Sequence, residues 1–333
     1  MGKRKVKNSK QDPKNAPANN KKSKKNKNKT LSSLMKNTNT DNIQLLEAEL
    51  QHLQDEALSI HNKEIESAKL SYNELISSIE QSDIILQVLD ARDPISCRLE
   101  EAEKLAKEKG KTLIHVLNKI DLIPKEVAID WLGEFTQTFG PTIAISATSQ
   151  EAASALINET ISQVSQSPQK VAVIGIKGVG KSTICSLNQI LIEVQSYNFV
   201  TSTIDSSLIG AIEYLGDLSD FALEIISRSQ DESIFDLLGI EPQEDENDVL
   251  KEYSKAQNKT LRKATKEFVN NILTNAQPFY AVPEDMPATN MSDNQLAIIN
   301  VLKSNETGDN AIHIVRGDPL VVNTALLEAS STK

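Results

Sequence analysis

The residues with the clearest chemical meaning form a glycine-rich loop after a short apolar run. Residues 175–182 read GIKGVGKS, which fits Gly-x-x-x-x-Gly-Lys-Ser between the run VAVI and a helical segment. In such a loop, glycines let backbone N–H groups turn toward phosphate oxygens, a lysine reaches the outer phosphates, and a hydroxyl can ligate Mg²⁺. The predicted phosphate contacts are Gly175, Ile176, Lys177, Gly178, Val179, Gly180, Lys181, Ser182 and Thr183, with Lys181 catalytic and Ser182 metal-binding.

A second pattern, LNKID at residues 117–121, closes another apolar run. A carboxylate at Asp121 can accept hydrogen bonds from the N1–H and the exocyclic amine of guanine, which adenine does not offer. We expect Asn118 to brace neighbouring loops and the stem of Lys119 to lie along the base plane. The pattern is weak alone and gains weight from the phosphate loop in the same chain.

A third short pattern, SAT, follows the next apolar run. It consists of Ser146, Ala147 and Thr148, and we expect backbone N–H groups around Ala147 to donate to the guanine O6. The base-reading elements thus precede the phosphate loop, an order that implies a circular permutation. In this order, the segments that sense the γ-phosphate lead directly into the C-terminal part of the chain.

Short strands must position these loops. DIILQVLD, TLIHVLN, TIAISA and KVAVIGI read as buried strands, and the segments between them read as helices. This alternation predicts an α/β fold, a mostly parallel, doubly wound sheet covered on both faces. Ligands of such sheets bind at the carboxyl ends of the strands, where all three patterns fall.

A further motif, VLDARDPISCR at residues 88–98, precedes the LNKID element. Through these motifs the chain resembles the circularly permuted GTPases of the YlqF/YawG type, and most closely their nucleostemin-like branch. The resemblance implies a nucleolar GTP/GDP-binding protein, with Mg²⁺, that acts in large (60S) ribosomal subunit biogenesis on the pre-ribosomal particle, through rRNA and ribosomal or assembly proteins. Asp90, Arg92 and Asp93 could form an Arg–Asp network at a strand end or act in catalysis.

The likeness extends to a predominantly helical region that ends at Phe279, Tyr280 and Pro283, and the tail beyond has no counterpart that we recognise. The amphipathic segment before the sheet could be a strut or a partner helix. We predict a disordered basic arm (1–40), this amphipathic helix (41–66), a circularly permuted GTPase domain (67–216), a helical C-terminal domain (217–290) and a poorly defined tail (291–333).

The family pattern weakens where the γ-phosphate should be sensed. The resemblance calls for a switch threonine, either Thr201 or Thr203, and we assign Thr203 a catalytic and metal-binding role. It also calls for Asp-x-Pro-Gly, for which the chain offers only residues 213–216, beginning at Glu213 and ending at the predicted catalytic Gly216. We therefore expect weak or partner-stimulated hydrolysis. A pseudo-GTPase scaffold and a P-loop ATPase with a fortuitous NKID are the alternatives.

The net charge of −10 hides a basic arm, because residues 1–40 carry 13 Lys or Arg and one acid, Asp12. This segment has too few apolar residues to fold alone, and it suits RNA phosphates or a nuclear import receptor, or serves as a solubilising tail. A mitochondrial presequence, typically Arg-rich, fits less well. The spacing of Cys97 and Cys185 argues against a disulfide scaffold or a zinc site, and we expect no membrane span.

Overall fold

The computed structural model describes most of the chain after residue 71. The described residues are 51–52, 59, 72–166, 170–195, 204–210, 214, 216–230, 233–274, 276–283, 293–302 and 311–316. The predicted basic arm lies outside them, and of the predicted amphipathic helix only residues 51, 52 and 59, all helical, lie inside. No helix in these ranges has both the length and the apolar character that a bilayer crossing demands.

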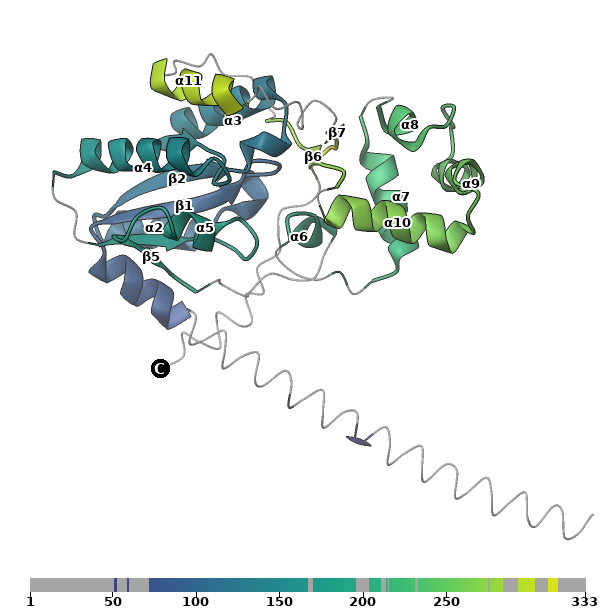
Figure 1. Cartoon of the computed structure of the whole chain (residues 1–333). Coiled ribbons are helices and arrows are strands. Elements are labelled where there is room, and N and C mark those ends of the chain that lie inside the picture. Colours follow the sequence, from purple (N-terminus) through teal and green to yellow (C-terminus); the bar gives the residue numbers. More distant parts are fainter. Residues whose placement is uncertain are drawn as a thin grey trace, which may run out of the picture. The chain divides into compact units, whose positions relative to one another are not determined.

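A five-stranded parallel sheet forms the core (Figure 1). Its strands are β1 (Ile84–Asp90), β2 (Thr112–Asn118), β3 (Thr142–Ala144), β4 (Val171–Ile174) and β5 (Leu191–Glu193), and their order is β3-β2-β1-β4-β5. Every residue of β1 is buried, as expected for a central strand covered on both faces. The predicted α/β fold and its first four strands are confirmed.

Helices connect the parallel strands. They are η1 (Ile95–Cys97), α2 (Glu100–Glu108), η2 (Ile120–Leu122), α3 (Lys125–Thr138), α4 (Gln150–Val164) and α5 (Lys181–Cys185), and a further helix spans 72–81. Right-handed crossovers place α2 and α3 on one face of the sheet, and α4 and α5 on the other. The direction of winding therefore reverses between β1 and β4, which makes this the switch point of the sheet.

A mainly helical region follows the sheet. Its helices are α6 (Ile204–Leu208), α7 (Leu218–Arg228), α8 (Ser233–Leu238), α9 (Glu246–Ala256) and α10 (Leu261–Leu273), and Figure 1 shows α7 to α10 gathered into one cluster. The Asp217 and Asp245 carboxylates accept backbone N–H bonds at the starts of α7 and α9. Asn258, at φ +50°, lies in the turn between α9 and α10, so this predicted helical stretch is interrupted.

Beyond residue 274, the described residues form two strands and one helix. The strands β6 (Phe279–Tyr280) and β7 (Ile312–His313) pair in parallel, and Tyr280 stacks on His313 with ring centroids 5.2 Å apart. Helix α11 (Asp293–Leu302) packs on α3, α4, β3 and η2, so this part of the predicted tail lies on the sheet domain.

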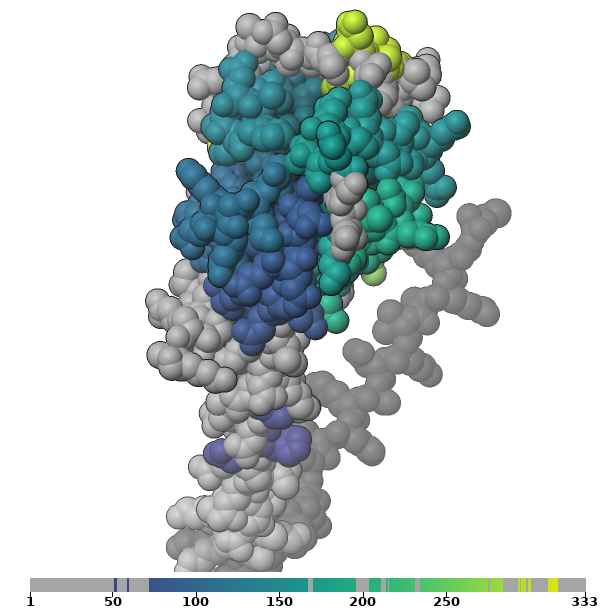
Figure 2. All heavy atoms as spheres, turned by 90° about the vertical axis from the view of Figure 1, so that its left-hand side faces the viewer, coloured from purple at the N-terminus to yellow at the C-terminus, as the bar shows by residue number. Residues whose placement is uncertain are grey.

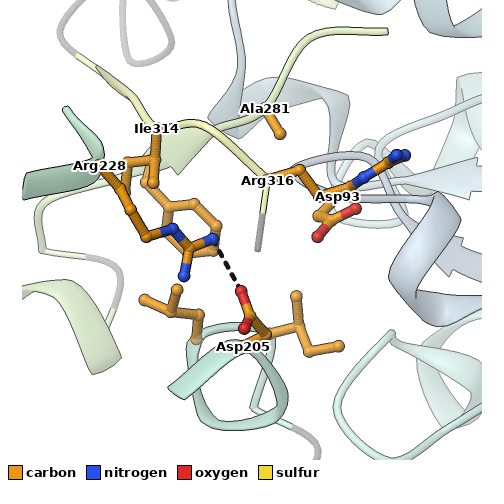
Figure 3. A pocket seen from close by; sticks show the side chains of 9 residues that line it. Asp93, Asp205, Arg228, Ala281, Ile314 and Arg316 are labelled. Atoms are coloured by element: carbon orange, nitrogen blue, oxygen red, sulfur yellow. Dashed lines mark hydrogen bonds and ion pairs between the residues drawn. The ribbon is translucent and has the colours of Figure 1, made fainter. Parts of the chain in front are cut away.

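A cavity of about 10 Å³, roughly the space of one water, lies between the sheet domain and the helical region (Figure 3). The loop after β1, helices α6 and α7, and the β6–β7 pair meet there. The charged side chains that line it are Asp93, Asp205, Arg228 and Arg316. Arg228 Nη2 donates to Asp205 Oδ1 at 2.8 Å, and this ion pair ties α7 to α6. The cavity therefore lies in a seam between the sheet and the helical cluster, where apolar side chains surround this ion pair.

Candidate nucleotide-binding site

The three loops predicted to bind a nucleotide converge at one edge of the sheet. The phosphate loop follows β4, the LNKID element ends β2, and the SAT triplet follows β3. Because these strands are parallel, their carboxyl ends all lie at the same end of the sheet. The switch point between β1 and β4 opens at this end. The residues that sequence reasoning selected from distant positions are thus neighbours.

Close backbone contacts explain the glycines of the phosphate loop. Gly175, Gly178 and Gly180 have φ values of +149°, +88° and +99°, which side-chain-bearing residues rarely adopt. A Cβ on Gly175 would stand 2.6 Å from the Val88 oxygen, and one on Gly178 would stand 2.7 Å from the Gly210 oxygen. Larger residues would therefore push the loop off the strand and off the segment after α6.

Lys181 begins the short helix α5 and is buried. Its ammonium donates to the Ile176 carbonyl at 3.0 Å, so the side chain folds back over the loop. Burial lowers the pKa of Lys181, although the nearby Glu193 charge works in the opposite direction. An anionic phosphate in the loop would place a negative charge next to this buried cation.

Asn118 connects all three loops, as the sequence led us to expect. Its Nδ2 donates to the Val179 carbonyl of the phosphate loop at 2.8 Å, and its Oδ1 accepts from the Ala147 N–H at 2.9 Å. A Cβ on Gly180 would collide with the same amide. The Ala147 N–H that we had assigned to guanine O6 is therefore engaged by Asn118 in this structure.

Lys119 lies beside the buried Asp90 rather than free in solvent. Its backbone is left-handed, with φ +67°, and its Nζ donates to Asp90 Oδ2 at 2.8 Å. Arg92 forms a fork with the same carboxylate through Nε at 2.9 Å and Nη2 at 2.8 Å. Burial alone would raise the pKa of Asp90, but the charges and hydrogen bonds of Arg92 and Lys119 lower it well below its usual range.

This network reaches the end of the helical region. The Arg92 guanidinium lies 4.7 Å from the ring centroid of Phe279. The backbone carbonyl of Arg92 accepts from the Ala281 N–H at 2.8 Å. The Ala281 carbonyl accepts from Trp131 Nε1 at 2.8 Å. Of the two roles considered for the DARDP residues, the Arg–Asp network at a strand end is present.

The remaining base-reading residues lie in the same place. Asp121 is half-buried in η2, and its carboxylate accepts no hydrogen bond from the described residues. The hydroxyls of Ser146 and Thr148 are 2.6 Å apart, which stiffens the turn around Ala147. A half-buried carboxylate beside a rigid turn fits a base with paired N–H donors.

The side that should sense the γ-phosphate looks different. Thr201, Thr203 and Glu213 lie outside the described residues. Gly216 is exposed just before α7, beside Tyr214, whose ring makes an edge contact with Phe221. The described backbone that lies against Gly178 belongs instead to Ile209 and Gly210, a segment that sequence reasoning did not select.

Sequence reasoning also missed Glu193. It ends β5, the strand paired with the phosphate-loop strand, and its Oε1 accepts from the Ser182 hydroxyl at 2.8 Å. A carboxylate next to the loop serine is the donor set by which P-loop proteins hold Mg²⁺. The available signal was the short apolar run LIEV, which we had not read as a strand.

Relatives match parts of the chain. A guanine nucleotide-binding protein-like 3-like protein from Bos taurus is 48% identical over 84 residues, 25% of this chain and 14% of that protein. Nuclear/nucleolar GTPase 2 from Oryza sativa subsp. indica is 29% identical over 233 residues, 59% of this chain and 43% of that protein. Along this chain the two base-reading loops precede the phosphate loop, which is the permuted order.

Among solved structures, the chain matches the crystal structure of GNP-bound YlqF from T. maritima, with a TM-score of 0.43 and 17% identity over 61% of this chain and 94% of that one. No protein-family model matches the chain. The chain spans less than half the length of the curated relatives it matches.

Proposed function

We propose that the chain is a guanine-nucleotide-binding assembly factor for the large (60S) ribosomal subunit, with weak or partner-stimulated GTP hydrolysis. The observation that carries the guanine-binding part is the Asn118 bridge, which joins the phosphate loop to both base-reading loops. These loops follow three different strands and meet at the carboxyl ends of the sheet. It is the arrangement needed to hold one nucleotide by its base and its phosphates.

The residues present fit GTP or GDP with Mg²⁺. The positive-φ glycines leave room for backbone N–H groups to face phosphates, and Lys181 supplies a buried positive charge. Asp121 would select guanine by accepting from its two N–H groups. Ser182 and Glu193 would hold Mg²⁺, which favours oxygen ligands together with phosphate and water. The bound metal would neutralise charge on the outer phosphates.

The cellular role rests on resemblance and composition. Relatives carry names such as nuclear GTP-binding protein and nuclear/nucleolar GTPase, which supports a nuclear or nucleolar site of action. The basic arm would contact rRNA of the pre-ribosomal particle and present lysine clusters to an import receptor.

A pseudo-GTPase scaffold is the second candidate, and a specific observation favours it. The carboxylate beside Ser182 belongs to Glu193, whose side chain is one methylene longer than that of the Asp usual in P-loop proteins. The sequence also offers no Asp-x-Pro-Gly after the phosphate loop. In this case the protein would bind guanine nucleotides without distinguishing GTP from GDP, and it would dock pre-ribosomal RNA and proteins as a fixed platform.

Binding of fluorescent GDP, a non-hydrolysable GTP analogue and ATP, each with Mg²⁺, tests the proposal. Lys181→Ala should weaken guanine-nucleotide binding by about 100-fold or more, because the buried cation contacts the outer phosphates. Lys170→Ala removes an exposed lysine before β4 and is the matched control. Binding that prefers ATP, or the absence of binding, would sink the proposal, and equal affinity for GDP and the GTP analogue would favour the scaffold.

Deleting residues 1–30 tests the RNA contact separately. The deletion should weaken binding to a ribosomal RNA fragment and reduce the slope of log affinity against log salt, because fewer counterions are released. Guanine-nucleotide binding should stay unchanged. An identical salt slope in the two proteins would show that the arm does not contact phosphates.

A further inference from the structure

The strand that carries the SAT loop, β3, ends the sheet on one side, and a side chain of α11 bonds to its outer edge. Ile145 N–H donates inward to the Leu117 carbonyl of β2 at 2.8 Å, so the neighbouring Ala144 directs its backbone groups outward. Gln295 from α11 fills this edge. Its Nε2 donates to the Ala144 carbonyl at 2.9 Å, and its Oε1 accepts from the Ala144 N–H at 3.3 Å.

A glutamine amide carries the same donor and acceptor as a backbone peptide group, so Gln295 replaces one residue of a neighbouring strand. The side chain is 5% exposed, and both hydrogen bonds are buried. Ile299, one turn further along α11, is fully buried and holds the helix against the sheet domain. Figure 2 shows the yellow atoms of α11 against the teal atoms of this domain.

The clamped residue is directly connected to both base-reading loops. Three positions after Ala144, the Ala147 N–H donates to Asn118. Ile145 directly follows Ala144, and its carbonyl accepts from the Ile120 N–H at 3.3 Å. This bond holds the η2 turn that contains Asp121. Helix α11 also contacts η2 directly. A shift of β3 at Ala144 would therefore move the groups that face the base.

We infer that Gln295 is a positioning residue for guanine selectivity, which it exerts by clamping the β3 edge at Ala144 and thereby fixing the two base-reading loops. The inference rests on the proposed guanine-nucleotide function and extends it, because it gives α11, in the region that the sequence left as an undefined tail, a defined task. Two strands, β2 and β1, lie between β3 and the phosphate-loop strand β4, so the clamp acts first on recognition of the base.

The test compares Gln295→Glu with Asn300→Asp. Both replace an amide on α11 by a carboxylate, but Asn300 is exposed, whereas Glu at 295 would place an acceptor against the Ala144 carbonyl. Gln295→Met, which removes both hydrogen bonds and keeps the length, is the second variant. For each protein, the ratio of GDP to ADP affinity and the amide hydrogen exchange of segment 142–149 are measured.

We expect Gln295→Glu to lower the GDP-to-ADP affinity ratio about fivefold and to speed exchange in 142–149 about tenfold, with Gln295→Met in the same direction and Asn300→Asp unchanged. An unchanged ratio in both Gln295 variants would overturn the positioning role, whether or not exchange is faster. Equal loss of GDP and ADP binding would also overturn it, because it would indicate general destabilisation.

Failure of the proposed function looks different. A wild-type chain that binds no guanine nucleotide would remove that function and the selectivity role together. A wild-type chain that binds GDP selectively while the Gln295 variants match Asn300→Asp would leave the function intact and overturn the clamp alone.

Discussion

The two sides of the candidate nucleotide site differ in how closely they follow the permuted GTPase pattern. On the base side, the motifs are complete and Asn118 joins three loops through two buried hydrogen bonds. On the γ-phosphate side, Asp-x-Pro-Gly is missing from the sequence, and the loop serine bonds to Glu193 at the end of a neighbouring strand. The proposed base-reading side thus keeps the complete motifs, and the proposed γ-phosphate side departs from them.

This difference teaches that holding a nucleotide and responding to its state are separable properties. Binding energy for a nucleotide would come from the phosphate loop and the base-reading loops, which Asn118 holds together here. A switch additionally requires segments whose conformation depends on the γ-phosphate. Variants on each side should therefore affect different measurements.

The largest effect should come from Asp121→Asn on the base side. GDP affinity should fall about 100-fold, because the new amide presents a donor to the guanine N–H groups, and affinity for xanthosine diphosphate should rise. Competition of both nucleotides with fluorescent GDP measures this. Asp130→Asn on α3 is the control, and unchanged selectivity in Asp121→Asn would break the comparison, because it would mean that the base side does not read guanine.

Asn118→Ala should have the next largest effect, because it cuts the link between the two sides. The Val179 carbonyl and the Ala147 N–H would lose their partner, at a cost of about 1–3 kcal/mol in the free energy of unfolding. GDP affinity should fall about tenfold, since both loops would loosen. Urea unfolding and GDP titration test this, with the exposed Asn158→Ala as the control. Full stability with normal binding would show that the bridge is dispensable.

Glu193→Gln probes the metal side. We expect the Mg²⁺-dependent gain in affinity for the GTP analogue to shrink about fivefold, because a neutral amide is a weaker Mg²⁺ partner than a carboxylate. GDP binding in EDTA should stay the same. Titrations with and without Mg²⁺ measure the difference, and Glu151→Gln on α4 is the control. If Mg²⁺ raised the affinity equally in the variant and the wild type, Glu193 would not be the carboxylate that helps to bind Mg²⁺.

The smallest effect on nucleotide binding is expected from Glu103→Gln, which tests the scaffold beneath the base side. Burial raises the pKa of Glu103, but hydrogen bonds from His115 and Arg98 and the Arg98 charge lower it from 4.5 to about 2. Because the folded-state pKa is the lower one, the pair stabilises the fold above pH 4.5, by about 1–2 kcal/mol once solvent screening of this partly exposed group is allowed for, and this contribution is lost as the pH falls toward 2.

The variant should therefore flatten the pH dependence of the unfolding free energy between pH 4.5 and 2, and be less stable than the wild type near neutral pH. Urea unfolding at a series of pH values measures this. Glu108→Gln, an exposed change on the same helix, should follow the wild-type curve. A wild-type-like curve for Glu103→Gln would show that the ion pair contributes nothing.

Local patterns predicted most of the sheet and the site. The first four strands could be read from continuous apolar runs, and the phosphate loop from glycine spacing, because both signals lie within a few consecutive residues. The bracing role of Asn118 was also predictable, since its chemistry follows from the motif. These features need no knowledge of which distant segments meet.

Three features could not be predicted, for a common physical reason. The pairing of Lys119 with Asp90, the approach of Glu193 to Ser182 and the capping of Ala144 by Gln295 all depend on contacts between separate elements. The short strand β5 gave too few residues for a period to show. The tail contains no motif that we recognised from the sequence, so nothing in it indicated that α11 covers the outer edge of β3.

The Gln295 clamp also has a consequence for the time course of synthesis. Ala144 and Gln295 are separated by 151 positions in the chain. At a translation speed of about 5–20 residues per second, Ala144 of β3 is synthesised roughly 8–30 s before Gln295, the residue that covers it. During this interval the strand presents unpaired backbone groups, which are a site for mispairing with other chains. The nascent protein therefore passes through an interval in which the outer edge of β3 is exposed and Gln295 is not yet present to cover it.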